Sequence, residues 1–62
     1  MSKKEIREEI RFWGLFSGHK ILDIDIDEYI IITSVSEYGF VYSNTLKEDN
    51  GTLNHIGTIL LN

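Results

Sequence analysis

The sequence predicts an α+β protein in which one N-terminal helix packs on a curved antiparallel sheet of about four strands. Apolar residues recur with the helical period at the start of the chain, and from His19 onward the period changes to two. Two Gly-containing turn signals divide the period-two region into hairpins. We therefore expect a single domain over residues 1–62, with a helix at about 3–13 and strands at about 20–27, 29–36, 39–44 and 52–61.

The helix begins with a capping signal. Ser2 and Glu5 form an S-x-x-E capping box, in which each side chain can bond the backbone N–H of the other residue. Ile6, Ile10 and Trp13 then fall on one stripe, which we expect to pack on the sheet. Gly14 follows the stripe and predicts a left-handed helix end.

The first two strands are predicted from alternation and from β-branched residues. Residues 20–27 place Leu22, Ile24 and Ile26 on one face, and residues 29–36 are rich in Ile, Val and Thr. The junction at Asp27-Glu28 is a poor two-residue turn, because neither residue is Gly or Asn. A single bent or bulged strand over residues 20–36 is therefore the alternative.

Two hairpins are predicted further along the chain. Glu37-Tyr38-Gly39 fits a three-residue loop with Gly39 in the left-handed position. Asn50-Gly51 is the strongest short hairpin signal, because both central positions of a type I′ turn need a positive φ.

The strand at 29–36 is apolar on both faces, and one amphipathic helix can cover only one of them. Large exposed apolar patches are uncommon on monomers. The sheet must therefore curl into a small barrel or be covered by a second chain. We expect a monomeric, barrel-like sheet because curling suffices, with a homodimer as the alternative.

Composition excludes several classes of function. The chain has no Cys, so disulfides and thiolate metal sites are impossible. The charged N-terminus is unlike a signal peptide, and no segment approaches the roughly 20 apolar residues that span a bilayer. We expect a cytoplasmic protein without membrane association. The net charge of −4 argues against phosphate-backbone binding and permits a partner with a basic surface.

Catalysis is not expected. A nucleophile needs an oriented base, and His19 and His55 stand in no catalytic motif. The segment "DIDIDE" starts like a calcium loop but lacks the Gly and Glu that an EF-hand needs later. We predict that the protein is not an enzyme and has no cofactor or metal site.

Asp23, Asp25 and Asp27 alternate along the first strand, and Glu28 extends the row. Asp is depleted in strands, so its presence needs an explanation. A solvated face or protection of a sheet edge would provide a structural one. The functional interpretation is a partner-binding surface, because alternate strand positions about 6.6–6.8 Å apart resemble the spacing of DNA phosphates.

The sequence therefore favours a small acidic, non-enzymatic regulator or inhibitor that binds a protein, such as a nucleic-acid-binding protein. In size, acidity and lack of catalytic groups it resembles the small acidic phage proteins that imitate DNA, although no motif aligns. An Ile-rich composition without Ala, Gln or Pro is typical of low-GC bacteria and their phages. The alternatives are a nucleic-acid-binding module that uses Tyr38, Phe40 and Tyr42, or a structural or assembly subunit.

Overall fold

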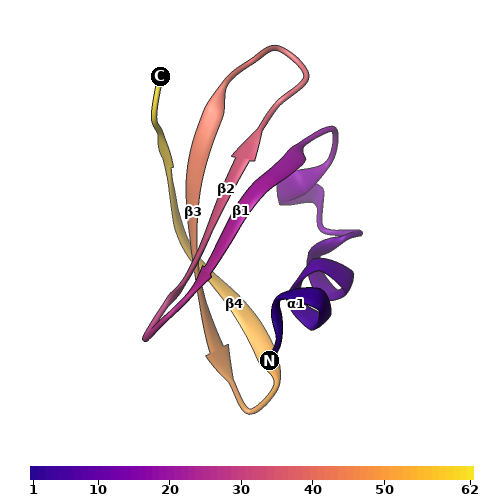
Figure 1. Ribbon diagram of the computed structural model, residues 1–62, viewed down its shortest axis with the longest axis vertical. Coiled ribbons are helices and arrows are strands. Elements are labelled where there is room, and N and C mark those ends of the chain that lie inside the picture. The colour runs from indigo at the N-terminus through magenta and orange to yellow at the C-terminus, as the bar shows by residue number, and fades with distance from the viewer.

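A computed structural model describes residues 1–62 (Figure 1). One α-helix and one short 3-10 helix precede a four-stranded antiparallel sheet in which every strand pairs with its neighbour in sequence, in the order β1-β2-β3-β4. This confirms the predicted α+β class. The elements are α1 (Lys3–Ile10), η1 (Gly14–Phe16), β1 (Lys20–Ile26), β2 (Ile30–Val35), β3 (Val41–Asp49) and β4 (Thr52–Leu60).

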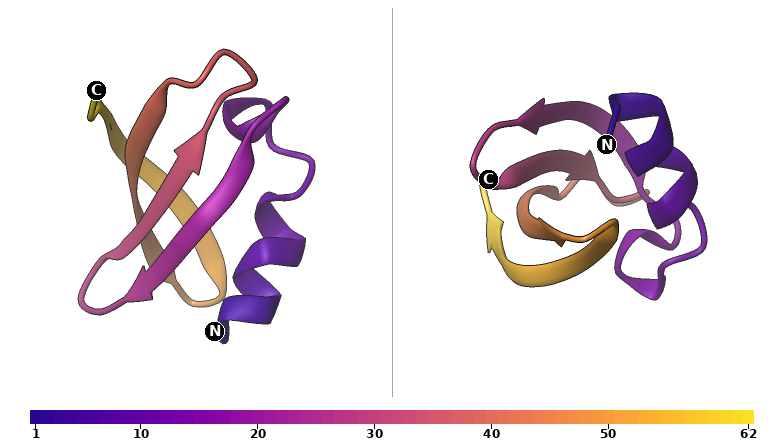
Figure 2. Two further views of the ribbon diagram at one scale, coloured as in Figure 1. Left: turned by 45° about the horizontal axis from the view of Figure 1, so that its top comes forward. Right: turned by 90° about the horizontal axis from the view of Figure 1, so that it is seen from below.

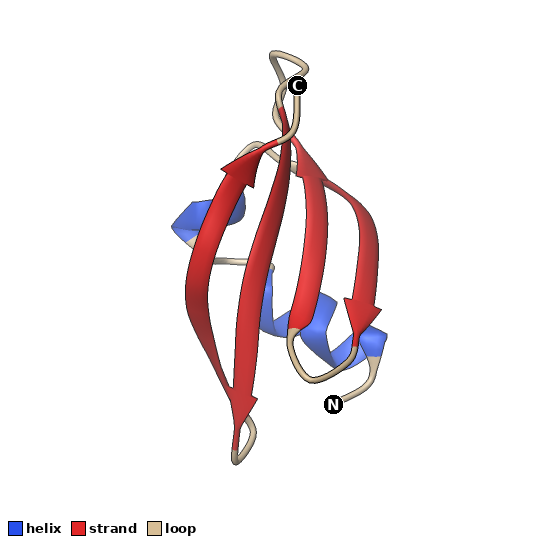
Figure 3. Ribbon diagram, turned by 90° about the vertical axis from the view of Figure 1, so that its left-hand side faces the viewer, coloured by secondary structure: helices blue, strands red, loops and turns tan.

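The sheet is open, and its edges β1 and β4 do not pair. The barrel considered above does not form, because each strand pairs only with its neighbour in sequence and the first and last strands do not meet. The predicted curvature is not confirmed, although the strands twist across one another (Figure 2). Helix α1 lies behind one face of the sheet in Figure 3 and leaves the other face without a covering layer. We call the face toward α1 the inner face and the opposite one the outer face.

Helix α1 begins as predicted. The Glu5 N–H donates to Ser2 Oγ at 3.1 Å, and the Ser2 N–H donates to Glu5 Oε1 at 2.9 Å. The backbone hydrogen bond from Ser2, followed by the bond to its side chain, lowers the pKa of the Glu5 carboxyl group. A lowered pKa in the folded state means that this carboxylate stabilises the fold above its unfolded pKa. That contribution is lost as the pH falls through the folded value.

Helix α1 ends at Ile10 rather than at about residue 13. The Trp13 N–H still bonds the Ile10 carbonyl at 3.0 Å, but Trp13 itself is extended, with φ −71° and ψ 134°. Its ring stacks on that of Phe16, with centroids 6.4 Å apart. The predicted left-handed Gly14 instead starts η1, and the positive φ of 75° occurs at Gly18. Packing of the two aromatic rings therefore replaces the last predicted helical turn.

The region from residue 20 to residue 36 forms two strands, not one bent strand. Ile26 pairs with Ile30, and the intervening loop is closed by a hydrogen bond from the Asp27 N–H to the Tyr29 carbonyl at 3.1 Å. β1 consequently ends at Ile26, and Asp27 lies in the loop rather than on the predicted strand 20–27.

The later hairpins keep their predicted turns. Gly39 has φ 87°, and Asn50 and Gly51 have φ 52° and 83°, as the two turn types require. β3, however, extends to Asp49 instead of ending near residue 44. Its polar second half pairs with the first half of β4, so pairing across the Asn50-Gly51 turn outweighs the low strand propensity of that half.

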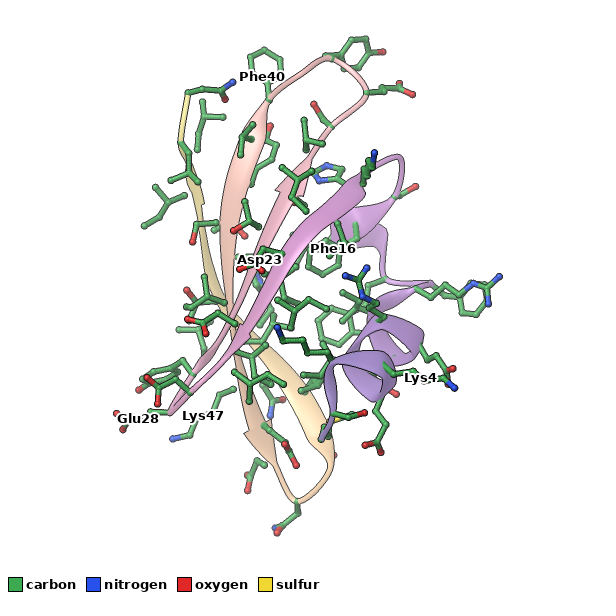
Figure 4. All side chains as sticks on the ribbon, in the orientation of Figure 1. Lys4, Phe16, Asp23, Glu28, Phe40 and Lys47 are labelled. Atoms are coloured by element: carbon green, nitrogen blue, oxygen red, sulfur yellow. The ribbon has the colours of Figure 1, made fainter.

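The core lies between α1, η1 and the inner face, and Phe16 points into it (Figure 4). A bulge in β1 changes which residues reach this core. Ile21 pairs with Ser34 and Asp23 with Thr33, so Leu22 is the extra residue and stays 49% exposed. The prediction that Leu22 faces inward is wrong, and Ile21 takes its place. Eight apolar residues are buried: Ile6, Ile10, Phe16, Ile24, Ile30, Ile32, Leu46 and Leu53.

Neither α1 nor η1 is long and apolar enough to cross a lipid bilayer.

We predict that Ile10→Ala lowers the free energy of unfolding by about 2–5 kcal/mol, because Ile10 is 1% exposed and its removal leaves a cavity. Urea unfolding followed by circular dichroism measures the change. Phe12→Ala is the matched control, since Phe12 is 86% exposed two residues away. Equal stability of the two variants would show that α1 does not contribute to the core.

Candidate functional site: an acidic sheet edge and a buried polar chain

The structure places the four predicted site residues at one edge of the sheet. Asp23 pairs with Thr33 and Asp25 with Ile31, and both side chains lie on the outer face because the adjacent Ile24 is buried inside. Asp27 and Glu28 follow in the β1–β2 loop, and all four residues are exposed. Figure 4 shows Asp23 on β1 and Glu28 at the loop, away from α1. We call Asp23, Asp25, Asp27 and Glu28 the acidic edge.

The charges of the acidic edge have no counter-ion within the chain. The one ion pair joins the N-terminal ammonium of Met1 to Glu48 Oε1 at 3.1 Å. Lys47 contacts the neighbouring Tyr29, the residue after Glu28, with its Nζ 5.8 Å from the ring centroid, but forms no ion pair with the acidic edge. The acidic edge therefore presents uncompensated negative charge to solvent.

The outer face beside the acidic edge mixes hydroxyl and apolar side chains. Two cross-strand rows run from the acids over this face: Asp25–Ile31–Thr45–Gly57 and Asp23–Thr33–Ser43–Ile59. Ile31 is half-buried by its neighbours, whereas Ile59, at the far edge, is exposed. The apolar side chains on the outer face of β2, for which we expected a cover, receive none within the chain.

On the inner face, a chain of hydrogen bonds crosses the sheet. His19 Nδ1 lies 3.0 Å from Ser34 Oγ, and Asn44 Nδ2 donates to the same Ser34 oxygen at 3.0 Å. Thr58 Oγ1 donates to Asn44 Oδ1 at 3.1 Å, and His55 Nε2 lies 2.7 Å from Thr58 Oγ1. We call these five residues the buried polar chain after Ser34 and Asn44, which are buried at its centre. His19 is half-buried, and Thr58 and His55 are exposed.

The direction of these bonds follows from the Ile32 carbonyl. Asn44 Nδ2 lies 2.9 Å from that oxygen, which can only accept, so the amide nitrogen faces Ile32 and the amide oxygen faces Thr58. The single hydroxyl hydrogen of Thr58 is used toward Asn44, so His55 Nε2 must carry a proton and donate to Thr58. No buried side-chain polar atom of the protein lacks a partner, as a stable polar network in a core requires.

His19 and Ser34 lie as close together as a catalytic base and its nucleophile, but the Ser34 hydroxyl is not accessible to a substrate. Ser34 and Asn44 are both 0% exposed, and Ser34 Oγ also accepts from Asn44. A substrate cannot reach this hydroxyl. The buried polar chain is therefore a structural device, which ties β2, β3 and β4 together in one register.

A half-open pocket of about 380 Å³ lies where the β2–β3 hairpin meets residues 17–19. Tyr38, Phe40 and Tyr42 all line it, as their alternate spacing suggested, together with His19 and Glu37. The three aromatic side chains differ in exposure, however. Tyr42 is half-buried and stacks on the His19 ring at 5.4 Å between centroids, whereas Tyr38 and Phe40 are exposed.

The hydrogen bonds of the buried polar chain were not predicted from the sequence. A signal was present, because Ser34 continues the inward positions of Ile30 and Ile32, and Asn44 stands at the same spacing before Leu46. Polar residues at core positions of two paired strands indicate a hydrogen bond between them.

Comparison of the chain with protein-family models, curated proteins and solved structures found no match. Nowhere in the structure do three or more His, Asp or Glu side chains come together in a group that could hold a metal ion. The two candidate sites are the acidic edge and the pocket at the β2–β3 hairpin, and the acidic edge carries the larger charge.

We predict that Asn44→Ala lowers the free energy of unfolding by at least about 1–3 kcal/mol, because it leaves the Ile32 carbonyl and the Thr58 hydroxyl without their partner. Ser43→Ala, the adjacent position on the outer face, should change stability by less than about 0.5 kcal/mol. Urea unfolding of both variants tests this. Similar values for the two would mean that the polar chain adds nothing to the stability of the sheet.

Proposed function

We propose that the protein is a small, cytoplasmic, non-enzymatic regulator or inhibitor that binds the basic surface of another protein through its acidic edge. One observation carries the proposal: Asp23, Asp25, Asp27 and Glu28 are all exposed at a sheet edge, and none has a cationic partner within the chain. A partner can therefore engage them without breaking an internal ion pair. Complementary charge of this kind mainly speeds association.

The acidic edge also has an energetic cost, which supports a role beyond solvation. Two carboxylates on alternate strand positions, such as Asp23 and Asp25, repel by roughly 0.6 kcal/mol in bulk water before salt screening. Ser, Thr or Lys would suit an exposed strand better than Asp does. Protection of the edge against strand pairing explains one charge on β1, but not the continuation of charge into the loop at Asp27 and Glu28.

The class of partner follows from the spacing of the charges. Asp23 and Asp25 stand about 6.6–6.8 Å apart along the strand, near the through-space step of DNA phosphates. A basic groove that normally holds nucleic-acid phosphates could accept such a pair, and the loop acids prolong the negative potential. The proposed partner is therefore a nucleic-acid-binding protein, and the composition supports an origin in a phage or prophage.

The test is the triple variant Asp23→Asn, Asp25→Asn, Asp27→Asn, which keeps shape and removes charge. Wild type and variant are immobilised, and proteins captured from lysate at low salt are quantified by mass spectrometry. We expect basic proteins enriched on the wild type to be lost on the variant, and wild-type capture to weaken as salt rises.

A charge-matched control removes three acids elsewhere: Glu8→Gln, Glu9→Gln, Glu37→Gln. It should capture the same basic proteins as the wild type, because the acidic edge is intact. If the triple Asp variant captures the same partners with unchanged salt dependence, the acidic edge is only a solvated face. If that variant aggregates, edge protection is its role.

Nucleic-acid binding is the second candidate, and the exposed aromatics of the hairpin pocket favour it. Tyr38 is 80% exposed beside the exposed Phe40, and bases could stack on both rings. Glu37 in the same pocket and the net charge of −4 oppose it. Because this negative charge repels phosphates, we rank nucleic-acid binding below protein binding.

Titration of single-stranded and duplex DNA, followed by tryptophan fluorescence, separates the two candidates. We expect no binding at physiological salt, because phosphate contacts need clustered cations. If binding is seen, Tyr38→Ala and Phe40→Ala should each weaken it by about 1–3 kcal/mol per stacked base without unfolding the protein. That result would favour the second candidate over the first.

A further inference from the structure

The C-terminal part of β4 carries an unusual concentration of exposed apolar side chains. Ile59 is 66% exposed, Leu60 51% and Leu61 55%, and Ile56 is exposed as well. Residues 50–62 contain no Asp, Glu, Lys or Arg, although the chain as a whole has a net charge of −4. We call residues 56–61 the C-terminal edge segment. Nothing else in the chain covers it, since its end lies far from α1 (Figure 1).

The backbone of this segment is open on one side. β4 pairs only with β3, so alternate N–H and C=O groups point away from the sheet. The Leu61 N–H donates to the Val41 carbonyl at 2.8 Å. By alternation, the backbone groups of Leu60 and Thr58 therefore face the open side. Such a row of free donors and acceptors is a template for an added strand.

The two edges of the sheet differ in their protection. β1 carries Asp23 and Asp25 and a bulge at Leu22, which are devices that block edge pairing. β4 has no charge and no Pro, and its one irregularity, at Ile56 opposite Thr45 and Leu46, lies at the start of the segment. Pairing from Gly57 to Leu60 is regular. One edge is therefore closed to strand addition, and the other is open.

We infer that two copies of the protein pair through their C-terminal edge segments, antiparallel about a two-fold axis, to form one continuous eight-stranded sheet. The distribution of charge favours a second copy of the protein as the strand that pairs with this segment. Two chains of −4 repel wherever their acids meet, and β4 is the one sheet edge along which they can approach without juxtaposing acids. Side chains on both faces would be covered, Ile59 on the outer face and Leu60 on the inner face.

Symmetry limits the assembly to a dimer. A two-fold contact uses the same segment on both copies and is closed once made. The edges left at the two ends of the joined sheet are both β1, and their acids repel any further strand. A head-to-tail contact between β4 and β1 would instead propagate into fibres, and the acidic edge disfavours it. The inference goes beyond the proposed function and leaves both acidic edges free.

The test is the solution mass of the wild type and of Ile59→Lys, measured by sedimentation equilibrium from micromolar to millimolar concentration. We expect the wild type to reach twice the chain mass of 7.2 kDa and Ile59→Lys to stay at 7.2 kDa. The added Lys changes the net charge from −4 to −3, so general repulsion falls and cannot explain a lost dimer. If Ile59→Lys does not fold, Leu61→Lys, beyond the last strand residue, replaces it.

Two controls carry the same change of charge. Leu22→Lys, on the β1 edge, and Thr33→Lys, on the outer face of β2 and away from the β4 edge, should both remain dimeric. Amide exchange of Thr58 and Leu60 should slow as concentration rises. A wild type that stays at 7.2 kDa up to millimolar concentration overturns the inference. Dissociation by Leu22→Lys overturns it in favour of β1 pairing, and dissociation by Thr33→Lys overturns it in favour of face-to-face packing.

Discussion

The contact between α1 and the inner face of the sheet is the interaction on which the rest of the structure depends. Ile6 and Ile10 are buried in one cluster with Ile24, Ile32 and Leu46. A chain of 62 residues is near the lower size at which apolar burial alone sustains a fold, and without Cys no disulfide can assist it. The capping box at Ser2 and Glu5 therefore matters beyond the helix, because it fixes where the apolar stripe of α1 begins.

The buried polar chain complements this contact in a different way. Apolar packing tolerates small shifts between strands, but the hydrogen bonds of Asn44 to Ile32, Ser34 and Thr58 do not. A slip of one residue between β2 and β3 would turn Asn44 to the outer face and leave buried groups without partners. The cluster thus supplies stability, and the polar chain specifies one register. This arrangement leaves the outer face and the two edges of the sheet without cover from the rest of the chain.

Much of the fold could be predicted from the sequence because its signals are local. The capping box, the stripe of Ile6 and Ile10, and the turn at Asn50-Gly51 each need only a few neighbouring residues, and the structure contains all three. The exposure of Asp23 and Asp25 belongs to the same category, since alternation with the buried Ile24 places both on the outer face. The type and order of the elements followed from these signals.

What could not be predicted depends on side-chain packing and strand pairing rather than on local sequence patterns. Helix α1 ends early because Trp13 stacks on Phe16, and Leu22 leaves the inner face because a bulge shifts the pairing of β1 with β2. The bond between His19 and Ser34 joins residues 15 apart, and no periodicity specifies it. The open form of the sheet is likewise a property of four strands taken together.

The neighbour-to-neighbour pairing of the strands also governs how the chain reaches this structure. Each of the three hairpins closes over a short loop, and the entropy lost in closing a loop grows with its length. Pairing can therefore proceed as a series of local steps, and chains dominated by local contacts fold fast for their size. Docking of α1 adds contacts over a much longer sequence separation, such as the Met1–Glu48 bond across 47 residues. Because Ile6 and Ile10 belong to the same buried cluster as the sheet residues, the core is complete only when α1 has docked.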